Sequence, residues 1–539
     1  MFNLVMNKIK RNMKALIIFI FVLQAFTHSN ATELHESLQV VQLPKGKVKG
    51  KVEDNIAFFG GIPYTKAPVG ELRWRAPVAV EPWDNIHDAT KFGAVCLQPE
   101  HNKQFIKYVK NQSEDCLTLN VWTPYGVNKK AVPNMPVMVW IHGGAFVIGS
   151  GSFPIYNGTE FAKNGIVLVT INYRLGNLGF FGHPAITTGD NGERTGNFGL
   201  LDQIAALKWV QNNISAFGGD KNNVTIFGES AGAVSVNYLM TLPETKGLFH
   251  RAIAQSGGGL QIPTDKSISR RRKPSEEERT KDLSGYWKIE GHQIADKLRN
   301  LPAKTMLKSN KKIGIGGGPY TDGTLISMTT AKAFSKGLQH DVPYLAGSNS
   351  FEGSLMNKIM NDRNPELIFW TFGDKRKAAK KLYTKNGTSA YDASFEFFGD
   401  TLFTSGAQFL VEKMEAKQSK GWLYYFSYIT HHKRDKAKGV PHGGEIIYVF
   451  DTLEKWSDKE LSRITDKDNN VSKTIQSYWI NFAKKGNPNS TNLADWPEYN
   501  KASPITLEFS MDGKVNTIKN FKSEKLEFVT KHLLTKIEY

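Results

Sequence analysis

Cysteine is almost absent from this sequence: Cys96 and Cys116 are its only two among 539 residues. Two thiols cannot supply a four-ligand zinc site, and there is no His-Glu-x-x-His stretch, so we expect no metal centre. The glycine-rich stretches at 257–259 and 314–318 lack the spacing of dinucleotide-binding or P-loop motifs. Internal repeats, low-complexity tracts and interdomain linkers are also missing. The sequence therefore predicts a protein that works without a cofactor.

Long apolar runs are equally scarce, and the only one lies near the N-terminus at residues 15–26. Basic residues precede it and Ser-Asn-Ala at 29–31 follows, which is the order of a secretory signal peptide. The run is shorter than the roughly 18–20 residues of a membrane span, so no stable membrane anchor is expected. We predict a signal peptide at 1–31, with Met1 or Met13 as the start. Residues 32–539 are expected to form a single domain that is secreted or periplasmic.

The two cysteines are expected to pair, because a secreted chain folds in an oxidising compartment. Both lie in the stretch 32–123, which is rich in short strand-like runs and turn residues. A bond between Cys96 and Cys116 closes a loop that stabilises the fold by about 3 kcal/mol if it acts through chain entropy.

Negative charge is in deficit, with a formal net charge of +18 and a pI near 9.4. Removal of residues 1–31, with four basic and no acidic residues, lowers this charge to +14. The basic residues are spread along the chain without a nucleic-acid-binding motif, so we expect no nucleic-acid partner. Weak adhesion to anionic surfaces stays open.

What the sequence does contain is a regular alternation of buried strands and helical stretches. Apolar strand candidates occur at 135–142, 165–173, 224–227, 251–256, 342–347 and 421–429. Residues 198–214 place apolar side chains at helical spacing, and Ser275 with Glu278 resembles a capping box that starts another helix. This alternation predicts an α/β fold with a mainly parallel central sheet covered by helices on both faces.

Residues 223–234 carry the feature around which the chain is organised. A β-branched and aromatic run at 224–227 leads into Gly-Glu-Ser-Ala-Gly at 228–232, and a helix-compatible segment continues to 240. Between a strand and a helix, the serine of Gly-x-Ser-x-Gly lies in strained backbone, so its neighbours must be small. The pentapeptide alone also occurs in ordinary glycine-rich turns. Ser230 is therefore a candidate nucleophile whose partners must come from elsewhere.

Two later positions supply those partners in the required order of serine, acid and histidine. A serine hydroxyl needs a base to take its proton, and that base needs an acid to orient it. Glu352 follows the strand candidate at 342–347, and His442 stands in a turn after the strand candidate at 421–429. Each residue alone is more often an ordinary loop residue, but the combination predicts a Ser230–His442–Glu352 triad.

Acyl transfer also needs hydrogen-bond donors for the developing oxyanion. The stretch His-Gly-Gly-Ala-Phe at 142–146 ends a strand candidate, and its side-chain-free Gly143 and Gly144 let backbone N–H groups approach a substrate. The N–H of Ala231, directly after the serine, would be a third donor.

These motifs together resemble the type B carboxylesterases, the family of carboxylesterases and cholinesterases with the α/β-hydrolase fold. The resemblance runs from about residue 44 to 510. It is carried by Phe-Gly-Gly-Ile-Pro-Tyr at 59–64, Leu-Arg-Trp-Arg-Ala-Pro at 72–77, Ser-Glu-Asp-Cys-Leu-Thr-Leu-Asn-Val at 113–121, Asn-Tyr-Arg at 172–174, Gly-Leu-Leu-Asp-Gln at 199–203, Phe-Gly-Glu-Ser-Ala-Gly at 227–232 and Trp-Pro at 496–497.

The resemblance implies the α/β-hydrolase fold with helical insertions and the same site residues that the residue patterns suggested. It implies Ser230, His442 and Glu352 as the triad, and Gly143, Gly144 and Ala231 as the oxyanion hole. It also implies Cys96–Cys116 as the family's N-terminal disulfide, Arg73–Glu114 and Arg174–Asp202 as structural ion pairs, and Glu229 and Glu445 as acidic residues near the triad.

The expected function is hydrolysis of small-molecule carboxylic esters through an acyl-enzyme, on uncharged esters with short to medium chains. The loop between the two cysteines contains no Trp to bind a quaternary ammonium, and the positive net charge repels cations, so a cholinesterase is disfavoured. Two alternatives stay open: a lipase, and a non-catalytic adhesion or recognition protein of the same fold. The sequence does not define the oligomeric state.

Overall fold

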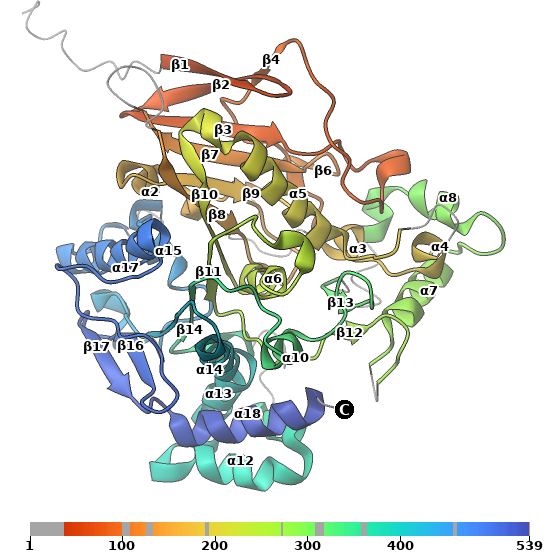
Figure 1. Ribbon diagram of the computed structural model, residues 1–539. Coiled ribbons are helices and arrows are strands. Elements are labelled where there is room, and N and C mark those ends of the chain that lie inside the picture. Colours follow the sequence, from red (N-terminus) through yellow and green to blue (C-terminus); the bar gives the residue numbers. More distant parts are fainter. Residues whose placement is uncertain are drawn as a thin grey trace, which may run out of the picture.

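The computed structural model describes residues 37–99, 108–125, 133–188, 193–270, 273–307, 317–356, 364–455 and 461–537 (Figure 1). The predicted signal peptide at 1–31 lies outside these residues. So does part of the glycine-rich stretch at 314–318.

The centre of the molecule is a sheet of thirteen strands. Its middle is parallel throughout, in the order β9 (Val167–Ile171), β8 (Met135–Ile141), β10 (Gly219–Glu229), β11 (Arg251–Gln255), β14 (Tyr344–Asn349), β15 (Gly421–Phe426) and β16 (Ile505–Phe509). The mainly parallel sheet predicted from the sequence is thereby confirmed. The candidate at 342–347 is displaced to 344–349, because the polar Ser348 and Asn349 still pair through their backbone with β15.

Antiparallel strands complete both ends of this sheet. At one end are β1 (Ser37–Leu43), β2 (Gly46–Glu53), β3 (Ile56–Pro63) and β7 (Thr118–Pro124), with β4 (Ile86–Asp88) beside β2. These strands form the top of Figure 1, while β17 (Val515–Lys519) closes the other end. Two pairs lie outside the sheet: β5 (Val95–Cys96) with β6 (Gln112–Ser113), and β12 (Thr264–Asp265) with β13 (Tyr320–Thr321).

The side chains of the central strands alternate between two apolar cores, one on each face of the sheet. In β8, for example, Val137, Val139 and Ile141 belong to one core, whereas Met138 and Trp140 belong to the other. The first core is covered by α5 (Phe198–Asn213), α6 (Ala231–Leu239) and α14 (Ser405–Glu412). The second is covered by α2 (Thr159–Lys163), α15 (Ile446–Val449) and α17 (Asp466–Lys485). Helices therefore cover both faces, as the sequence predicted.

Two helical insertions leave the sheet at the carboxyl ends of β11 and β14. The first contains α7 (Glu276–Tyr286), α8 (Ile294–Arg299) and α10 (Thr330–Ser335), and Ser275 caps α7 in the predicted capping box. The second contains η6 (Glu352–Leu355), η7 (Pro365–Lys375), α12 (Arg376–Tyr383), η8 (Lys385–Gly387), α13 (Ala390–Gly399), the π-helical η9 (Asp400–Thr404), α14 and η10 (Lys413–Ala416). Each insertion contributes to an apolar cluster without any strand residue. The second cluster is joined by α18 (Ser523–Ile537), and the first also contains residues from outside the insertion, namely Trp74, Leu178, Phe181, Ile186 and Phe198.

The remaining short helices lie in connections between these elements. They are η1 (Gly70–Leu72), η3 (Pro154–Tyr156), α3 (Gly176–Gly179), α4 (Pro184–Thr187), η4 (Ile214–Phe217), η5 (Pro243–Thr245), η11 (His431–Lys433) and η12 (Leu453–Lys455). No helix among the described residues is long and apolar enough to span a membrane.

The predicted disulfide and both predicted ion pairs are present. Cys96 and Cys116 are bonded. Arg73 lies 2.6 Å from Glu114, and Arg174 lies 2.7 Å from the fully buried Asp202. The Arg73 guanidinium also donates hydrogen bonds to the carbonyl oxygens of residues 299 and 301, at 2.6 and 2.5 Å. It therefore joins the disulfide loop to the first insertion.

Replacement of both cysteines by alanine (C96A/C116A) is expected to lower the free energy of unfolding by about 3 kcal/mol, because the unfolded chain regains the freedom that the closed loop removes. Urea denaturation of the oxidised protein and the variant measures this difference. Dithiothreitol should lower the midpoint of the parent protein and leave that of the variant unchanged. Equal midpoints in the oxidised protein and the variant would contradict the prediction.

Candidate active site

Ser230 lies at the turn between β10 and α6, in an unfavourable backbone conformation. Its φ is +55° and its ψ is −121°, a conformation that non-glycine residues rarely adopt. A Cβ on Gly232 would lie 1.9 Å from the carbonyl oxygen of Ile141, and one on Gly228 would lie 2.6 Å from the same atom. Only glycine fits at either position, so the strand and helix approach closely enough to fix the serine at the end of β10.

Glu352 and His442 come together from the two later stretches that the sequence singled out. Glu352 begins η6 just after β14, and the segment before it pairs with the chain at Pro441. The Nδ1 atom of His442 lies 2.5 Å from Oε2 of Glu352. The Glu352 side chain is almost completely buried, and the His442 side chain is 9% exposed. The acid therefore fixes the orientation of the imidazole ring.

Residues that the sequence reasoning missed hold this carboxylate in place. Ser256 Oγ donates a hydrogen bond to Oε1 of Glu352 at 2.5 Å, and the backbone N–H of Asn349 donates another at 2.7 Å. Ser354 Oγ in turn accepts a hydrogen bond from the N–H of His442. Ser256 and Asn349 are polar residues at the ends of otherwise apolar strands. A polar residue at the end of a strand was the only feature of the sequence that could have indicated them.

Glu445 is a second buried carboxylate with well-defined partners. It accepts hydrogen bonds from the side-chain amides of Gln255, at 3.0 Å, and Asn349, at 2.5 Å. The indole N–H of Trp479 donates to Gln255 and so orients that amide. Burial raises the pKa of Glu445, whereas these donors act in the opposite direction. Glu445 thus belongs to a polar layer beneath Glu352.

Glu229 lies on the other side of His442, with Oε1 at 3.1 Å from Nε2 of the imidazole. Neither of these two atoms has a hydrogen-bond partner among the described residues. Burial raises the pKa of Glu229 to about 8. Burial lowers the pKa of His442, but the carboxylates of Glu229 and Glu352 outweigh that effect and raise it to about 9. The carboxylate of Glu229 therefore favours the protonated form of the imidazole.

Gly143 lies directly beside Ser230, and Gly144 follows it with a φ of +108°. A Cβ on Gly143 would lie 3.1 Å from Cβ of Ser230, and one on Gly144 would lie 2.1 Å from the carbonyl oxygen of Ile148. Within the described part of the chain, the N–H groups of Gly143, Gly144 and Ala231 donate to no backbone or side-chain acceptor. These three donors remain available beside the serine.

The structure thus brings His442 into contact with Glu352 and with Glu229, the residue before Ser230, and places Gly143 beside that serine. Among the described residues, no group of three or more His, Cys, Asp or Glu side chains is arranged to hold a metal ion.

Comparison with known proteins identifies the family of the chain. The model of the carboxylesterase family matches residues 37–529, and the chain belongs to this family. Its sheet and helices have the α/β-hydrolase fold of the solved carboxylesterases to which it is similar.

Particular relatives cover most of the chain. The para-nitrobenzyl esterase of Bacillus subtilis is 35% identical, covering 90% of this chain and 97% of its own. Carboxylesterase 1C of Mus musculus is 30% identical, covering 92% of this chain and 93% of its own. A solved PNB esterase superimposes with a TM-score of 0.77 at 32% identity, over 92% of this chain and all of the other. The solved Geobacillus stearothermophilus carboxylesterase EST55 also superimposes with a TM-score of 0.77. It is 30% identical, over 90% of this chain and 98% of its own. The protein is accordingly a carboxylesterase.

Replacement of Glu229 by glutamine (E229Q) is expected to lower the pKa of His442 by about one unit or more, because a neutral amide no longer favours the protonated imidazole. Since a base must be neutral to accept a proton, the acid limb of the kcat/KM profile should move to lower pH. The measurement is hydrolysis of a p-nitrophenyl ester from pH 5 to 10, with the exposed Glu244→Gln as a matched control. An acid limb that stays in place or moves upward would contradict the proposed electrostatic coupling.

Proposed function

We propose that this protein hydrolyses uncharged carboxylic esters of short to medium chain length through an acyl-enzyme. The observation that carries the proposal is the 2.5 Å contact between Glu352 and His442, formed beside the strained turn that bears Ser230. Such a serine, histidine and acid arrangement serves to activate a hydroxyl for attack on a carbonyl.

In the first half-reaction, His442 Nε2 accepts the proton of Ser230 as its Oγ attacks the ester carbonyl. Glu352 keeps the proton of His442 on Nδ1 and stabilises the imidazolium that forms. The imidazolium then protonates the departing alkoxide, which leaves as the alcohol. Nε2 has no hydrogen-bond partner among the described residues, which supports its role as the acceptor. The hydrogen bond between Ser230 and His442 forms before these steps, when the substrate binds.

The oxyanion of each tetrahedral intermediate would be held by the N–H groups of Gly143, Gly144 and Ala231. Each such donor typically lowers the barrier by about 2.7–4 kcal/mol. In the second half-reaction, His442 takes a proton from water, the resulting hydroxide attacks the acyl-enzyme, and the proton returns to Ser230. The products are a carboxylic acid and an alcohol.

The preference for uncharged esters follows from the charges of the site and of the whole chain. The buried carboxylates of Glu229 and Glu445 disfavour an anionic group near His442, and the basic surface disfavours cations. We also propose that residues 1–31 direct the protein out of the cytosol and that residues 32–539 act as one domain. The Cys96–Cys116 disulfide supports an oxidising compartment.

Replacement of Ser230 by alanine (S230A) is expected to lower kcat/KM for p-nitrophenyl butyrate by about 10⁴-fold or more, because no other hydroxyl occupies the end of β10. The exposed Ser215→Ala is the matched control and should retain full activity. A fluorophosphonate probe should label the parent protein and not S230A. Near-full hydrolysis by S230A would refute the assignment, and a parent protein that neither hydrolyses nor reacts with the probe would favour the adhesion alternative.

The chain-length preference separates a carboxylesterase from a lipase. We expect higher kcat/KM for p-nitrophenyl butyrate than for the palmitate ester, with no rise in rate when the substrate passes its solubility limit. Initial rates across a series of acyl chain lengths measure this preference. A maximum at palmitate together with interfacial activation would instead identify a lipase.

A further inference from the structure

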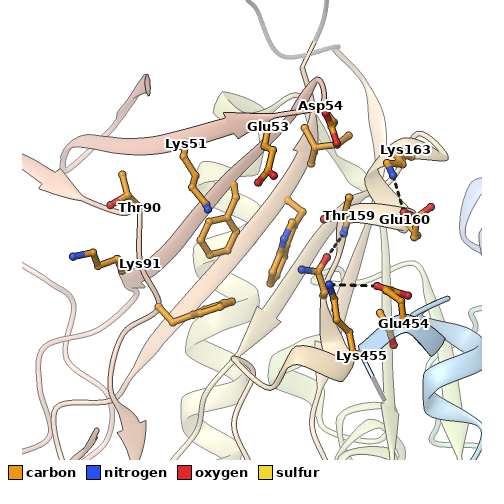
Figure 2. A pocket seen from close by; sticks show the side chains of 16 residues that line it. Lys51, Glu53, Asp54, Thr90, Lys91, Thr159, Glu160, Lys163, Glu454 and Lys455 are labelled. Atoms are coloured by element: carbon orange, nitrogen blue, oxygen red, sulfur yellow. Dashed lines mark hydrogen bonds and ion pairs between the residues drawn. The ribbon is translucent and has the colours of Figure 1, made fainter. Parts of the chain in front are cut away.

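A cavity of about 630 Å³ lies among the N-terminal strands, away from Ser230 (Figure 2). Its walls come from β2, β3, β7, α2 and η12, together with the loop at 90–92. Its volume falls within the roughly 300–1,000 Å³ typical of small-molecule sites. Figure 2 shows Lys51 and Glu53 on one strand facing Thr159, Glu160 and Lys163 across the hollow.

The strand register separates this cavity from the esterase site. Trp122, in its wall, pairs with Leu168 near the amino end of β9. The parallel neighbour of Leu168 in β8 is Met138, three residues before Ile141. Ser230 instead follows the carboxyl end of β10, beside Ile141. The cavity therefore lies toward the amino ends of the parallel strands and Ser230 toward their carboxyl ends, so the cavity is not part of the ester-binding site.

An aromatic surface forms one wall of the cavity. The ring of Phe58 lies 5.0 Å from that of Phe92 and 5.0 Å from that of Trp122. Phe58 and Trp122 are almost completely buried, whereas Phe92 is 43% exposed. The three rings are tilted against one another, by 65° between Phe58 and Phe92 and by 50° between Phe92 and Trp122. Phe92 alone therefore offers a ligand an exposed apolar ring, and keeping that ring in contact with water is unfavourable.

The other walls carry equal numbers of positive and negative side chains. The basic residues are Lys51, Lys91, Lys163 and Lys455, and the acidic residues are Glu53, Asp54, Glu160 and Glu454. Some of these charges are already paired, Glu160 with Lys163 at 2.8 Å and Glu454 with Lys455 at 3.4 Å. The lining is thus electrically balanced and does not favour a phosphate, a carboxylate or an amine. It does offer hydrogen-bond donors and acceptors all around the aromatic wall.

We propose that this cavity binds a neutral saccharide. A pyranose ring has an apolar face of C–H groups that packs against an aromatic ring, and its hydroxyl groups both donate and accept hydrogen bonds. The exposed ring of Phe92 meets that apolar face. The carboxylates accept hydrogen bonds from the sugar hydroxyls, and the lysines donate to the hydroxyl oxygens. Such a site would let the enzyme hold a sugar-containing surface or substrate while the ester site works independently.

The test uses the purified full-length protein and saturation-transfer NMR with glucose, maltose and cellobiose as probes, and isothermal titration calorimetry for the affinity. Glucuronate and glucosamine are the matched anionic and cationic analogues of glucose. At least one neutral saccharide should receive saturation through its ring protons and bind more tightly than either charged analogue. Replacement of Phe92 by alanine (F92A) should weaken that binding about tenfold, as expected for loss of one aromatic contact.

A second exposed aromatic residue supplies the control. Trp370 is 63% exposed and does not line this cavity, so Trp370→Ala should bind the saccharide like the parent protein. Melting temperatures show whether both variants remain folded; if F92A unfolds, Lys91→Gln together with Glu53→Gln tests the same wall through its hydrogen bonds. The proposal is overturned if no neutral saccharide binds, if a charged analogue binds more tightly, or if the folded wall variants bind with unchanged affinity.

Discussion

The close approach of α6 to the end of β8 is the constraint on which the rest of the site depends. The Ile141 carbonyl oxygen leaves no room for a side chain at residue 228 or 232, so the chain must turn there through glycine. That turn forces Ser230 into a positive φ and places it against Gly143. The backbone conformation is unfavourable in isolation, and the two apolar cores on either side of the sheet hold it in place.

Burial of several carboxylates beside one imidazole gives the site its electrostatic character. Glu352 and Glu445 receive hydrogen bonds from neighbouring donors, whereas the Glu229 oxygen nearest His442 receives none among the described residues. Two of the three acids are thus held in place by hydrogen bonds, and the third faces the imidazole of His442 directly. The difference arises from the strand-end residues Ser256, Gln255 and Asn349 rather than from the acids themselves.

Much of this arrangement could be predicted from the sequence because it depends on local pattern. The apolar runs predicted the parallel strands, the small residues around Ser230 predicted the strained turn, and chain order predicted Glu352 and His442. Most hydrogen bonds to Glu352 and Glu445 could not be predicted, because the side-chain donors Ser256, Gln255 and Asn349 are distant in sequence from their acceptors and meet them only when β11 and β14 pair. Ser256, for example, lies 96 positions from Glu352. Polar residues at strand ends are common, and only the folded sheet distinguishes these.

The apolar clusters of the two insertions contain no strand residues, and this affects which parts of the molecule can change around the active site. The first cluster reaches the sheet through α5, to which its Phe198 belongs. Both insertions begin at the carboxyl ends of the strands, where Ser230 also lies. Substitutions in the insertions therefore change the surroundings of the nucleophile, while the strands that position it keep their residues. A change within either cluster can therefore alter the walls around the nucleophile without replacing any side chain of the strands that support it.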